Sequence, residues 1–291
     1  MTTTDLTCIG VLAHPLRSRT FPVAQRIVDN LRENGINTWV HKEWVEADVV
    51  ENVSCADMVI AIGGDGAMLR VARVCAPFKI PVLGLNMGQL GFLTEINSPD
   101  DWENCLERLL KGDYWIEDRM MLRASVLHND EVLVSGDALN DVVISGNIFG
   151  KMIKLDCYID EHWTTTYNAD ALVIATATGS TAYTLALGGP ILPPELHNIL
   201  IVPAAPHLSM DRPIVISEGS RVEVKASSNN RSEIILSVDG VVLKHIKKAD
   251  RVFVQASEHK SRFVRFRGRN YFYRSLLDRL EPRSQRAKND E

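Results

Sequence analysis

The sequence lacks the features that mark secreted, membrane-spanning and zinc-binding proteins. Its five cysteines form no Cys-x-x-Cys pair, and the cysteines and histidines show no zinc-ligand spacing. Residues 1–9 are too polar for a signal peptide, and the longest apolar runs are far too short to span a bilayer. We therefore expect a soluble, cytoplasmic protein whose cysteines are reduced and buried.

The sequence also has a small net charge and lacks several familiar catalytic signatures. The formal net charge of -5 gives no general reason to expect a nucleic acid or an anionic membrane as a partner. The eight histidines form no visible pair with a serine or cysteine nucleophile. The sequence has no Gly-Lys-Ser/Thr signature, which excludes the P-loop way of holding a nucleotide. A chain of 291 residues is long enough for about two ordinary globular domains.

The most informative stretch of the first half is a glycine-rich turn. Residues 58–62 form a short apolar run, which predicts a strand buried on both faces. The turn Gly63-Gly64-Asp65-Gly66 follows, and helical spacing of apolar residues begins at Ala67. Glycines let a ligand approach closely, and backbone N–H groups at such a turn favour phosphate. Asp65 could then hold a metal ion or accept a proton, or it could merely cap the helix.

Strands and helices alternate over the first 111 residues. Further apolar strands are expected near residues 8–13, 37–42 and 81–85, with Thr20 capping the first helix and Gly35 ending it. This alternation predicts a parallel α/β sheet, on which ligands lie beyond the carboxyl ends of the strands. Asp65 and the loop 86–93 both follow such ends, so they could line one crevice.

The pattern changes near Arg119. From there to Arg267 the apolar segments are short, rich in valine and isoleucine and separated by polar turns, which predicts an all-β sandwich. Helix is plausible only near residues 180–187. We therefore predict an α/β domain over residues 1–118 and a β-sandwich, dinucleotide-binding domain over residues 119–267. The tail 268–291 regains helical spacing and is expected to pack back on the first domain.

Polar residues beside apolar strands are the site candidates of the second half. Asn140-Asp141 starts a strand and suits an adenine edge or a ribose diol, although an ordinary polar turn explains it as well. Asp170 precedes another strand, which leads into small hydroxyl residues. Ser180 or Thr181 could cap a helix there and create an anion site. Asp239-Gly240 is a hairpin signal first and a site candidate second.

Taken together, these motifs resemble those of the NAD kinase family. The glycine turn alone is a weak signal, because diacylglycerol-kinase-like lipid kinases and 6-phosphofructokinases carry a similar one. The stretch from Thr178 to Tyr183 is far more specific. In chain order the matching motifs are Gly63-Gly64-Asp65-Gly66, Asn86-x-Gly88-x-Leu90-Gly91-Phe92-Leu93, Asn140-Asp141, Thr178-Gly179-Ser180-Thr181-Ala182-Tyr183, Gly188-Gly189-Pro190, Pro206-His207, Arg212-Pro213 and Val238-Asp239-Gly240.

The resemblance implies an ATP-dependent kinase of the 2′-hydroxyl on the adenosine ribose of NAD, giving NADP. It also implies a divalent metal, usually Mg²⁺, a homodimer or homotetramer, and an α/β domain followed by a β-sandwich with a returning tail. Asp65 would be the proton acceptor. The dinucleotide would lie between the domains with its adenosine ribose facing the glycine turn. The implied contact residues are Gly66, Asn140, Asp141, Lys151, Asn168, Asp170, Thr181, Ala182, Tyr183, Thr184, Leu185, Ala186 and Ala205.

The sequence departs from the family pattern at four places. Ala177 stands where proline is common, Asp141 where glutamate is frequent, and Ala169 where glycine is frequent. Val241 stands where the family often has glutamine, which removes a polar contact. We therefore assign no contact role to Val241. Two rival functions remain in view. A lipid kinase would need an exposed apolar or basic membrane-facing patch, and a non-catalytic NAD(P)-binding sensor would be favoured if Asp65 were replaced.

Overall fold

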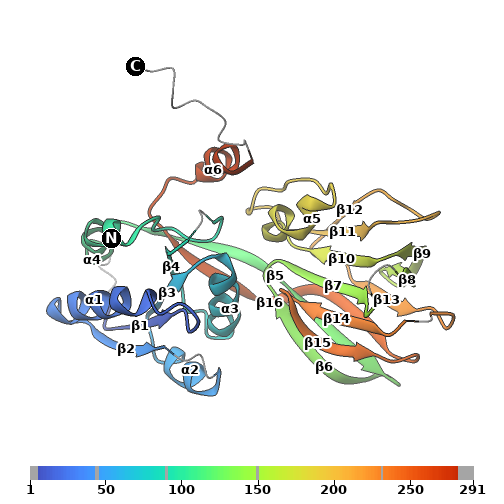
Figure 1. Cartoon of the computed structure of the whole chain (residues 1–291), viewed down its shortest axis with the longest axis horizontal. Coiled ribbons are helices and arrows are strands. Elements are labelled where there is room, and N and C mark those ends of the chain that lie inside the picture. Colours follow the sequence, from blue (N-terminus) through green and yellow to red (C-terminus); the bar gives the residue numbers. More distant parts are fainter. Residues whose placement is uncertain (1–5, 43–45, 89–90, 149–150, 231, 281–291) are drawn as a thin grey trace, which may run out of the picture. The chain divides into compact units, whose positions relative to one another are not determined.

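The computed structural model describes residues 6–42, 46–88, 91–148, 151–230 and 232–280. The chain divides into two compact units (Figure 1). The first, which we call the α/β unit, comprises Met1–Glu117 with Arg262–Glu291, and the second, the β unit, comprises Asp118–Ser261. The part of the predicted tail beyond residue 280 lies outside the described residues.

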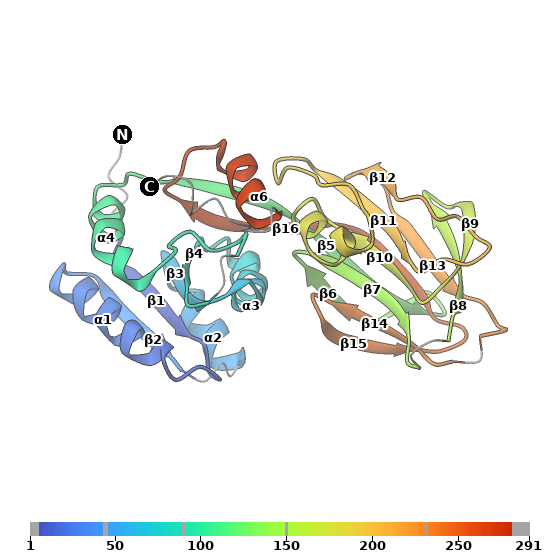
Figure 2. The same ribbon diagram turned by 45° about the horizontal axis from the view of Figure 1, so that its top comes forward.

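A parallel sheet in the order β2-β1-β3-β4 forms the centre of the α/β unit. Figure 2 shows α1 and α4 on one side of this sheet and α2 and α3 on the other. All residues of β3 and β4 are buried, which confirms the predicted parallel α/β architecture. The elements are β1 (Cys8–Ala13), α1 (Thr20–Glu33), β2 (Asn37–His41), α2 (Glu46–Val53), β3 (Met58–Gly63), α3 (Asp65–Cys75), β4 (Val82–Asn86) and α4 (Trp102–Leu110).

The first helix differs from expectation at its start. Thr20 does not cap α1 but is its first residue, and it is fully buried. Its hydroxyl donates to the carbonyl of Arg17 at 2.7 Å, so the side chain is used inside the preceding turn. Gly35 lies just beyond the helix with a φ of +78°, the left-handed conformation that favours glycine there.

The end of the described chain adds two further elements to the α/β unit. Phe263, near the end of β16 (Arg251–Arg265), pairs in parallel with Val82 of β4. A helix, α6 (Tyr271–Leu280), follows.

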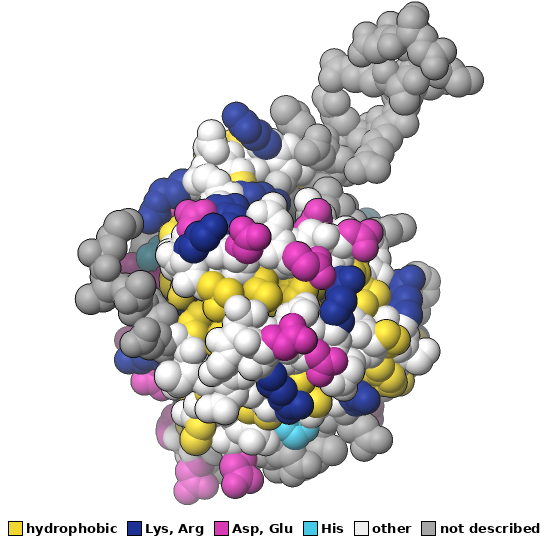
Figure 3. All heavy atoms as spheres, turned by 90° about the vertical axis from the view of Figure 1, so that its left-hand side faces the viewer, with side chains coloured by type: hydrophobic (Ala, Val, Ile, Leu, Met, Phe, Trp, Pro, Cys, Tyr) yellow, Lys and Arg dark blue, Asp and Glu magenta, His cyan; other side chains and the backbone are white. Residues whose placement is uncertain are grey.

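On the face of the molecule in Figure 3, acidic and basic side chains are interspersed around a band of apolar ones, so this face has no patch of a single charge sign.

The β unit is an antiparallel sandwich, as predicted. One sheet has the strand order β12-β11-β10-β7-β14-β15. The other pairs β16, β13, β8 and β9 in that order, and β5 pairs with both β16 and β6. Alternate residues point inward, and Ile144, Leu155 and Val252 share one core. The strands are β5 (Trp115–His128), β6 (Glu131–Ala138), β7 (Asp141–Gly146), β8 (Ile153–Ile159), β9 (His162–Ala169), β10 (Ala171–Ala175), β11 (Asn198–Ala204), β12 (Ile214–Ser217), β13 (Val222–Ala226), β14 (Ile234–Val238) and β15 (Val241–Ile246).

Candidate functional site

Asp65 does not cap the helix that it begins. The cap position of α3 belongs to Gly64, whose backbone is extended. The Asp65 carboxylate instead reaches the loop after β4, where Oδ2 accepts from the N–H of Phe92 at 2.7 Å and Oδ1 from the N–H of Leu93 at 3.1 Å. One hydrogen bond to each oxygen fixes the plane of the carboxylate and leaves further lone pairs on both oxygens.

Gly91 allows this arrangement. A Cβ at Gly91 would lie 2.0 Å from Oδ1 of Asp65, so a side chain cannot coexist with the observed carboxylate. The start of the same loop is closed by Asn86, whose amide accepts from the N–H of Gly88 and donates to its carbonyl, both at 3.1 Å. Gln89 and Leu90 of this motif lie outside the described residues. The loops after β3 and β4 thus contact each other directly.

Two further polar side chains follow β1 at the same sheet edge. A Cβ at Gly63 would lie 3.6 Å from the His14 ring, and one at Gly88 would lie 3.3 Å from an Arg17 guanidinium nitrogen. Burial lowers the pKa of His14, and the positive charges of Arg17 and then Arg70 lower it further. The carboxyl edge of the parallel sheet therefore combines the Asp65 carboxylate with the Arg17 guanidinium and a His14 ring whose lowered pKa favours its neutral form.

Asp141 is an acid in an unusual environment. It is the first residue of β7, is only 7% exposed, and its carboxylate takes part in no hydrogen bond among the described residues. Burial, followed by the nearby charge of Asp239, raises the pKa of Asp141 to about 6. A buried acid without a partner is a strong candidate for ligand contact.

The turn that carries Asp141 is held by the hairpin residue Asp239. The Asp239 carboxylate accepts from the N–H groups of Leu139 at 2.9 Å, Asn140 at 2.8 Å and Asp141 at 3.2 Å. Asp239 has a φ of +45° and Gly240 one of +76°, so a left-handed turn orients the carboxylate. The sequence predicted this hairpin turn, but its task of holding the Asn140-Asp141 segment becomes visible only in the fold.

The predicted helix at residues 180–187 is much shorter than expected. The chain forms a 3₁₀ turn at Thr178–Thr181 and a single α-helical turn at Tyr183–Ala186. Ser180 and Thr181 cap nothing. Their hydroxyls donate to the carbonyls of Ala177 at 2.6 Å and Thr178 at 3.2 Å. Small hydroxyl residues compete in this way with regular helix, so the predicted helix-end anion site is absent from this stretch.

The 3₁₀ turn nevertheless packs directly on the Asn140 segment. A Cβ at Gly179 would lie 2.1 Å from the Asn140 carbonyl oxygen, which makes glycine necessary. Thr176 donates from its backbone to the Asn140 carbonyl at 2.9 Å and from its hydroxyl to the Leu139 carbonyl at 2.6 Å. Asn140, Asp141 and the Thr181–Ala186 stretch are thus gathered at one end of β10, where Ala175 pairs with Asp141.

The other predicted contact residues of the β unit lie elsewhere. Asp170 and Ala205 flank the opposite end of β10, where Ala171 pairs with Ala204. Asn168 joins them there, because its amide donates to the His207 carbonyl at 3.0 Å. Lys151 is exposed in a loop. The candidates therefore form two groups, separated by the length of one strand, or roughly 15 Å.

Comparison with known proteins places this geometry in a family. Residues 9–114 match the ATP-NAD kinase N-terminal domain, and residues 139–266 match the ATP-NAD kinase C-terminal domain. A NAD kinase of Caldanaerobacter subterraneus subsp. tengcongensis is 35% identical, over 94% of this chain and 99% of the relative. The chain belongs to the ATP-NAD kinase family.

Further relatives agree with this assignment. A NAD kinase of Chloroflexus aggregans is 37% identical, over 94% of this chain and 98% of its own length. Among solved structures, yeast NADH kinase complexed with NADH has a TM-score of 0.83 at 23% identity, covering 94% of this chain and 87% of its own. The NAD kinase from Archaeoglobus fulgidus in complex with ATP has a TM-score of 0.73 at 24% identity, covering 94% and 98%. These structures support the fold, and the sequence relatives support the kinase prediction over a lipid kinase or a sensor.

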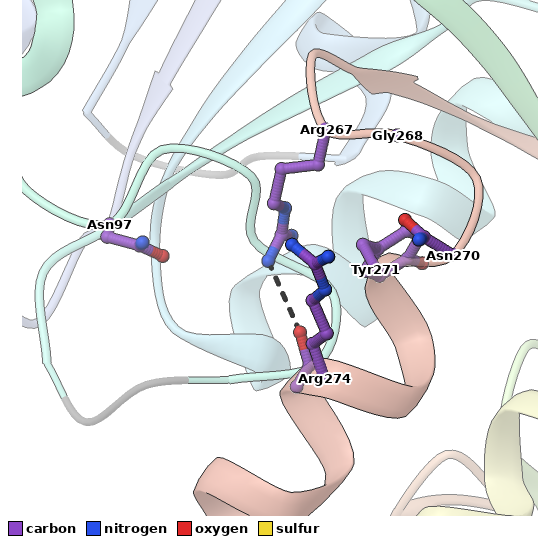
Figure 4. Close-up of a pocket in the computed structure, with 7 residues that line it drawn as sticks. Asn97, Arg267, Gly268, Asn270, Tyr271 and Arg274 are labelled. Atoms are coloured by element: carbon purple, nitrogen blue, oxygen red, sulfur yellow. Dashed lines mark hydrogen bonds between the residues drawn. The ribbon is translucent and has the colours of Figure 1, made fainter.

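A pocket in the α/β unit contains none of the residues predicted as contacts from sequence. It has a volume of about 330 Å³ and lies at the start of α6 (Figure 4). Figure 4 shows the side chains of Arg267 and Arg274 among those that line it. The lining residues are Asn97, Arg267, Gly268, Asn270, Tyr271, Arg274 and Ser275.

In this member of the NAD kinase family, several residues close to the Asp65 turn were not predicted from the sequence. Arg17 and His14 follow a strand end and could have been found from that position alone. Phe92 and Leu93 lie in the predicted loop 86–93, but nothing in the sequence shows that their N–H groups bind Asp65. Within the described part of the chain no group of three or more metal-ligating side chains occurs, and none of the helices described there is long and apolar enough to cross a membrane.

Proposed function

We propose that this member of the NAD kinase family transfers the γ-phosphoryl group of ATP to the 2′-hydroxyl on the adenosine ribose of NAD, giving NADP. The observation that carries the proposal is the Asp65 carboxylate. It lies in a glycine-rich turn at the carboxyl end of a parallel strand, with each oxygen oriented by one backbone N–H. That is the place and geometry in which an α/β sheet presents a group to its ligand.

Asp65 would act as the proton acceptor. A ribose hydroxyl is a poor nucleophile, and phosphoryl transfer depends on alignment of the acceptor and on stabilisation of charge. Each Asp65 oxygen accepts one hydrogen bond, from the N–H of Phe92 or of Leu93. Each oxygen can accept a further hydrogen bond from the ribose hydroxyl. A carboxylate that is already oriented loses little freedom when the hydroxyl arrives.

The phosphates of the donor would be held at the same sheet edge. Backbone N–H groups at the start of α3 can donate to phosphate oxygens, because Gly64 and Gly66 carry no side chain to block them. Arg17 and His14 add cationic or hydrogen-bonding groups beside that turn. This environment favours a triphosphate over an uncharged donor.

The dinucleotide would be held by the β unit. The buried Asp141 carboxylate has no hydrogen-bond partner among the residues that the structure describes, so a hydroxyl or amino group of NAD would satisfy it. Asn140 offers an amide beside it, and Asp170 offers a second carboxylate at the far end of β10. A separation of roughly 15 Å suits an extended dinucleotide better than a mononucleotide.

We propose Mg²⁺ as the metal. Mg²⁺ is usually held by one or two carboxylates together with substrate phosphates, so it needs no cage of protein side chains. The described residues fit that mode, since they offer no such cage but do provide Asp65 beside the proposed phosphate site. The metal would neutralise phosphate charge when bound. Chelation by EDTA should abolish NADP formation, and Mg²⁺ should restore it.

The defining experiment is incubation of the purified protein with NAD, ATP and Mg²⁺. NADP is measured with a dehydrogenase that requires it, and reactions without ATP or without NAD serve as controls. The proposal predicts NADP formation that depends on both substrates. Phosphorylation of diacylglycerol vesicles with no NADP formed would contradict it.

We also propose a homodimer or homotetramer in the cytoplasm. Val241 and Val242 on the edge strand β15 are 51% and 56% exposed, and closed association could cover such an edge. The five cysteines are all free, which is compatible with a reducing compartment. A fully active monomer at micromolar concentration, measured by light scattering, would contradict the assembly.

A further inference from the structure

The loop that holds Asp65 is fixed along β4. The N–H of Glu95 donates to the Gly84 carbonyl at 2.9 Å, and the N–H of Asn86 donates to the Ile96 carbonyl at 2.8 Å. A Cβ at Gly84 would lie 3.0 Å from the Cα of Thr94, so the loop packs tightly against the strand. Small shifts of this segment would move the two N–H groups that orient Asp65.

Arg265 stabilises the same loop by binding one of its backbone carbonyls. It is completely buried, and its Nη1 donates to the Leu93 carbonyl at 2.9 Å. Its Nε donates to Oε2 of Glu117 at 2.8 Å, and Glu117 is itself 4% exposed. Leu93 therefore links the two interactions, since its N–H binds Asp65 while its carbonyl binds Arg265.

Tyr271 and Arg267 complete the support. The Tyr271 hydroxyl lies 2.9 Å and 3.1 Å from the two Glu117 carboxylate oxygens, to which it donates. Arg267 donates to the Thr94 carbonyl at 3.0 Å and to Glu95 at 2.9 Å and 3.0 Å. Figure 4 shows that Arg267 and Tyr271 belong to the segment that leads into α6.

Burying these charged side chains costs more desolvation free energy than burying apolar ones would. Burying charged groups carries a desolvation penalty that their mutual attraction repays only with good geometry. Phe266, Arg267 and Arg265 all donate to Glu95, so its carboxylate is well satisfied. A buried network in which most members are hydrogen-bonded restricts the groups that it holds, although Nη2 of Arg265 has no hydrogen-bond partner among the described residues. Rigidity at this place is useful, because the network ends on the backbone that orients Asp65.

We propose that Arg265, held by Glu117 and Tyr271, is a positioning residue for Asp65. It fixes the Leu93 carbonyl, and thereby the two N–H groups that set the plane of the Asp65 carboxylate. Arg265 itself touches no reacting atom. The inference rests on the proposed function, since it assigns the network a part in proton acceptance by Asp65.

Tyr271→Phe is the mildest test, because it removes only the hydroxyl and keeps the ring beneath the Arg265 and Arg267 guanidinium groups. We expect the turnover number to fall roughly 3- to 30-fold, since misplacement by a fraction of an ångström suffices for such losses. The Michaelis constants for NAD and ATP should change less than twofold. Glu117→Gln, which keeps the shape of the side chain, should act in the same direction.

Trp115→Phe is the matched control. The Trp115 indole donates to the Arg267 carbonyl at 2.7 Å, so it stabilises the same tail segment without reaching the Leu93 carbonyl. This variant should lower the melting temperature and leave the turnover number unchanged. An equal loss of turnover in Trp115→Phe would mean that the effect of Tyr271→Phe reflects general stability.

The decisive comparison is a double-mutant cycle. If Tyr271 acts through the Asp65 carboxylate, Tyr271→Phe should change the residual turnover of Asp65→Asn by less than about twofold. The same fold loss in both backgrounds would overturn the inference. Hydrogen exchange provides a readout without activity, since the Phe92 and Leu93 amides should exchange faster in Tyr271→Phe but not in Trp115→Phe. Wild-type protein that forms no NADP would refute the proposed function, and unchanged exchange in Tyr271→Phe would refute the positioning role.

Discussion

At the scale of single residues, two aspartates of the candidate site have opposite surroundings. Asp65 accepts a hydrogen bond on each oxygen from backbone N–H groups. Asp141 is buried, accepts none among the described residues and lies near the charge of Asp239. The first arrangement suits a carboxylate that stays in place through a reaction cycle. The second arrangement suits a carboxylate that binds a group of the ligand. In the free protein, its burial without a partner lowers the stability of the fold.

Asp141 should therefore lower stability at neutral pH. Its pKa is raised to about 6, so the folded protein retains a proton that the unfolded chain releases as pH rises from about 4 to 6, and the free energy of unfolding falls over that window. Asp141→Asn should remove this dependence. Its stability relative to wild type should improve by about 2 kcal/mol between pH 4.5 and pH 7.5. Denaturant unfolding at both pH values measures this, and an unchanged difference would contradict the buried acid.

Arg17 gives a second prediction at this scale. The residue follows β1 and lies beside Gly88. Arg17→Ala should raise the Michaelis constant for ATP roughly 10- to 150-fold, because a charge-assisted contact to phosphate is worth about 1.5–3 kcal/mol. The constant for NAD should change much less. Steady-state kinetics with each substrate varied in turn will show it, and a larger effect on NAD would place the donor elsewhere.

At the scale of elements, local patterns predicted strands better than helix ends. The apolar run at residues 58–62 is the buried strand β3 at Met58–Gly63. The expected helix at residues 180–187 reduces to one turn at Tyr183–Ala186, because the Ser180 and Thr181 hydroxyls bond to nearby carbonyls. Thr20 likewise turned its hydroxyl inward instead of capping. Hydroxyl residues near a helix start permit several local structures, so sequence alone does not choose among them.

The hairpin between β14 and β15 carries its own prediction. Asp239 holds three N–H groups of the segment before β7. Asp239→Ala leaves those donors without their acceptor, and we expect destabilisation of about 2–4 kcal/mol. Asp239→Asn keeps one acceptor oxygen and should lose less. Melting curves of the two variants provide the measurement. Equal stability of Asp239→Ala and wild type would show that the clamp is dispensable.

At the scale of the whole molecule, the order of the two folds was readable from the change in periodicity near Arg119. The residues that support the candidate site could not be predicted from the sequence. Arg265 and Leu93 are 172 positions apart, and although Leu93 ends the loop motif, Arg265 belongs to no motif. A buried arginine on a backbone carbonyl leaves no local trace, because the pairing depends on how distant segments return to each other. The motif residues, Phe92 and Leu93 among them, therefore identified the family, while the residues that hold their loop in place emerged only from the fold.

The proposed reaction depends most on Asp65 as the proton acceptor, and one comparison tests this role directly. The turnover numbers of wild type and Asp65→Asn should be measured with saturating NAD, ATP and Mg²⁺. The variant keeps the size of the side chain and an acceptor oxygen for one of the two N–H groups, so it should remain folded by circular dichroism. We predict a turnover lower by roughly 10²- to 10⁴-fold, the usual contribution of a general base. Near-normal turnover of the folded variant would contradict the account.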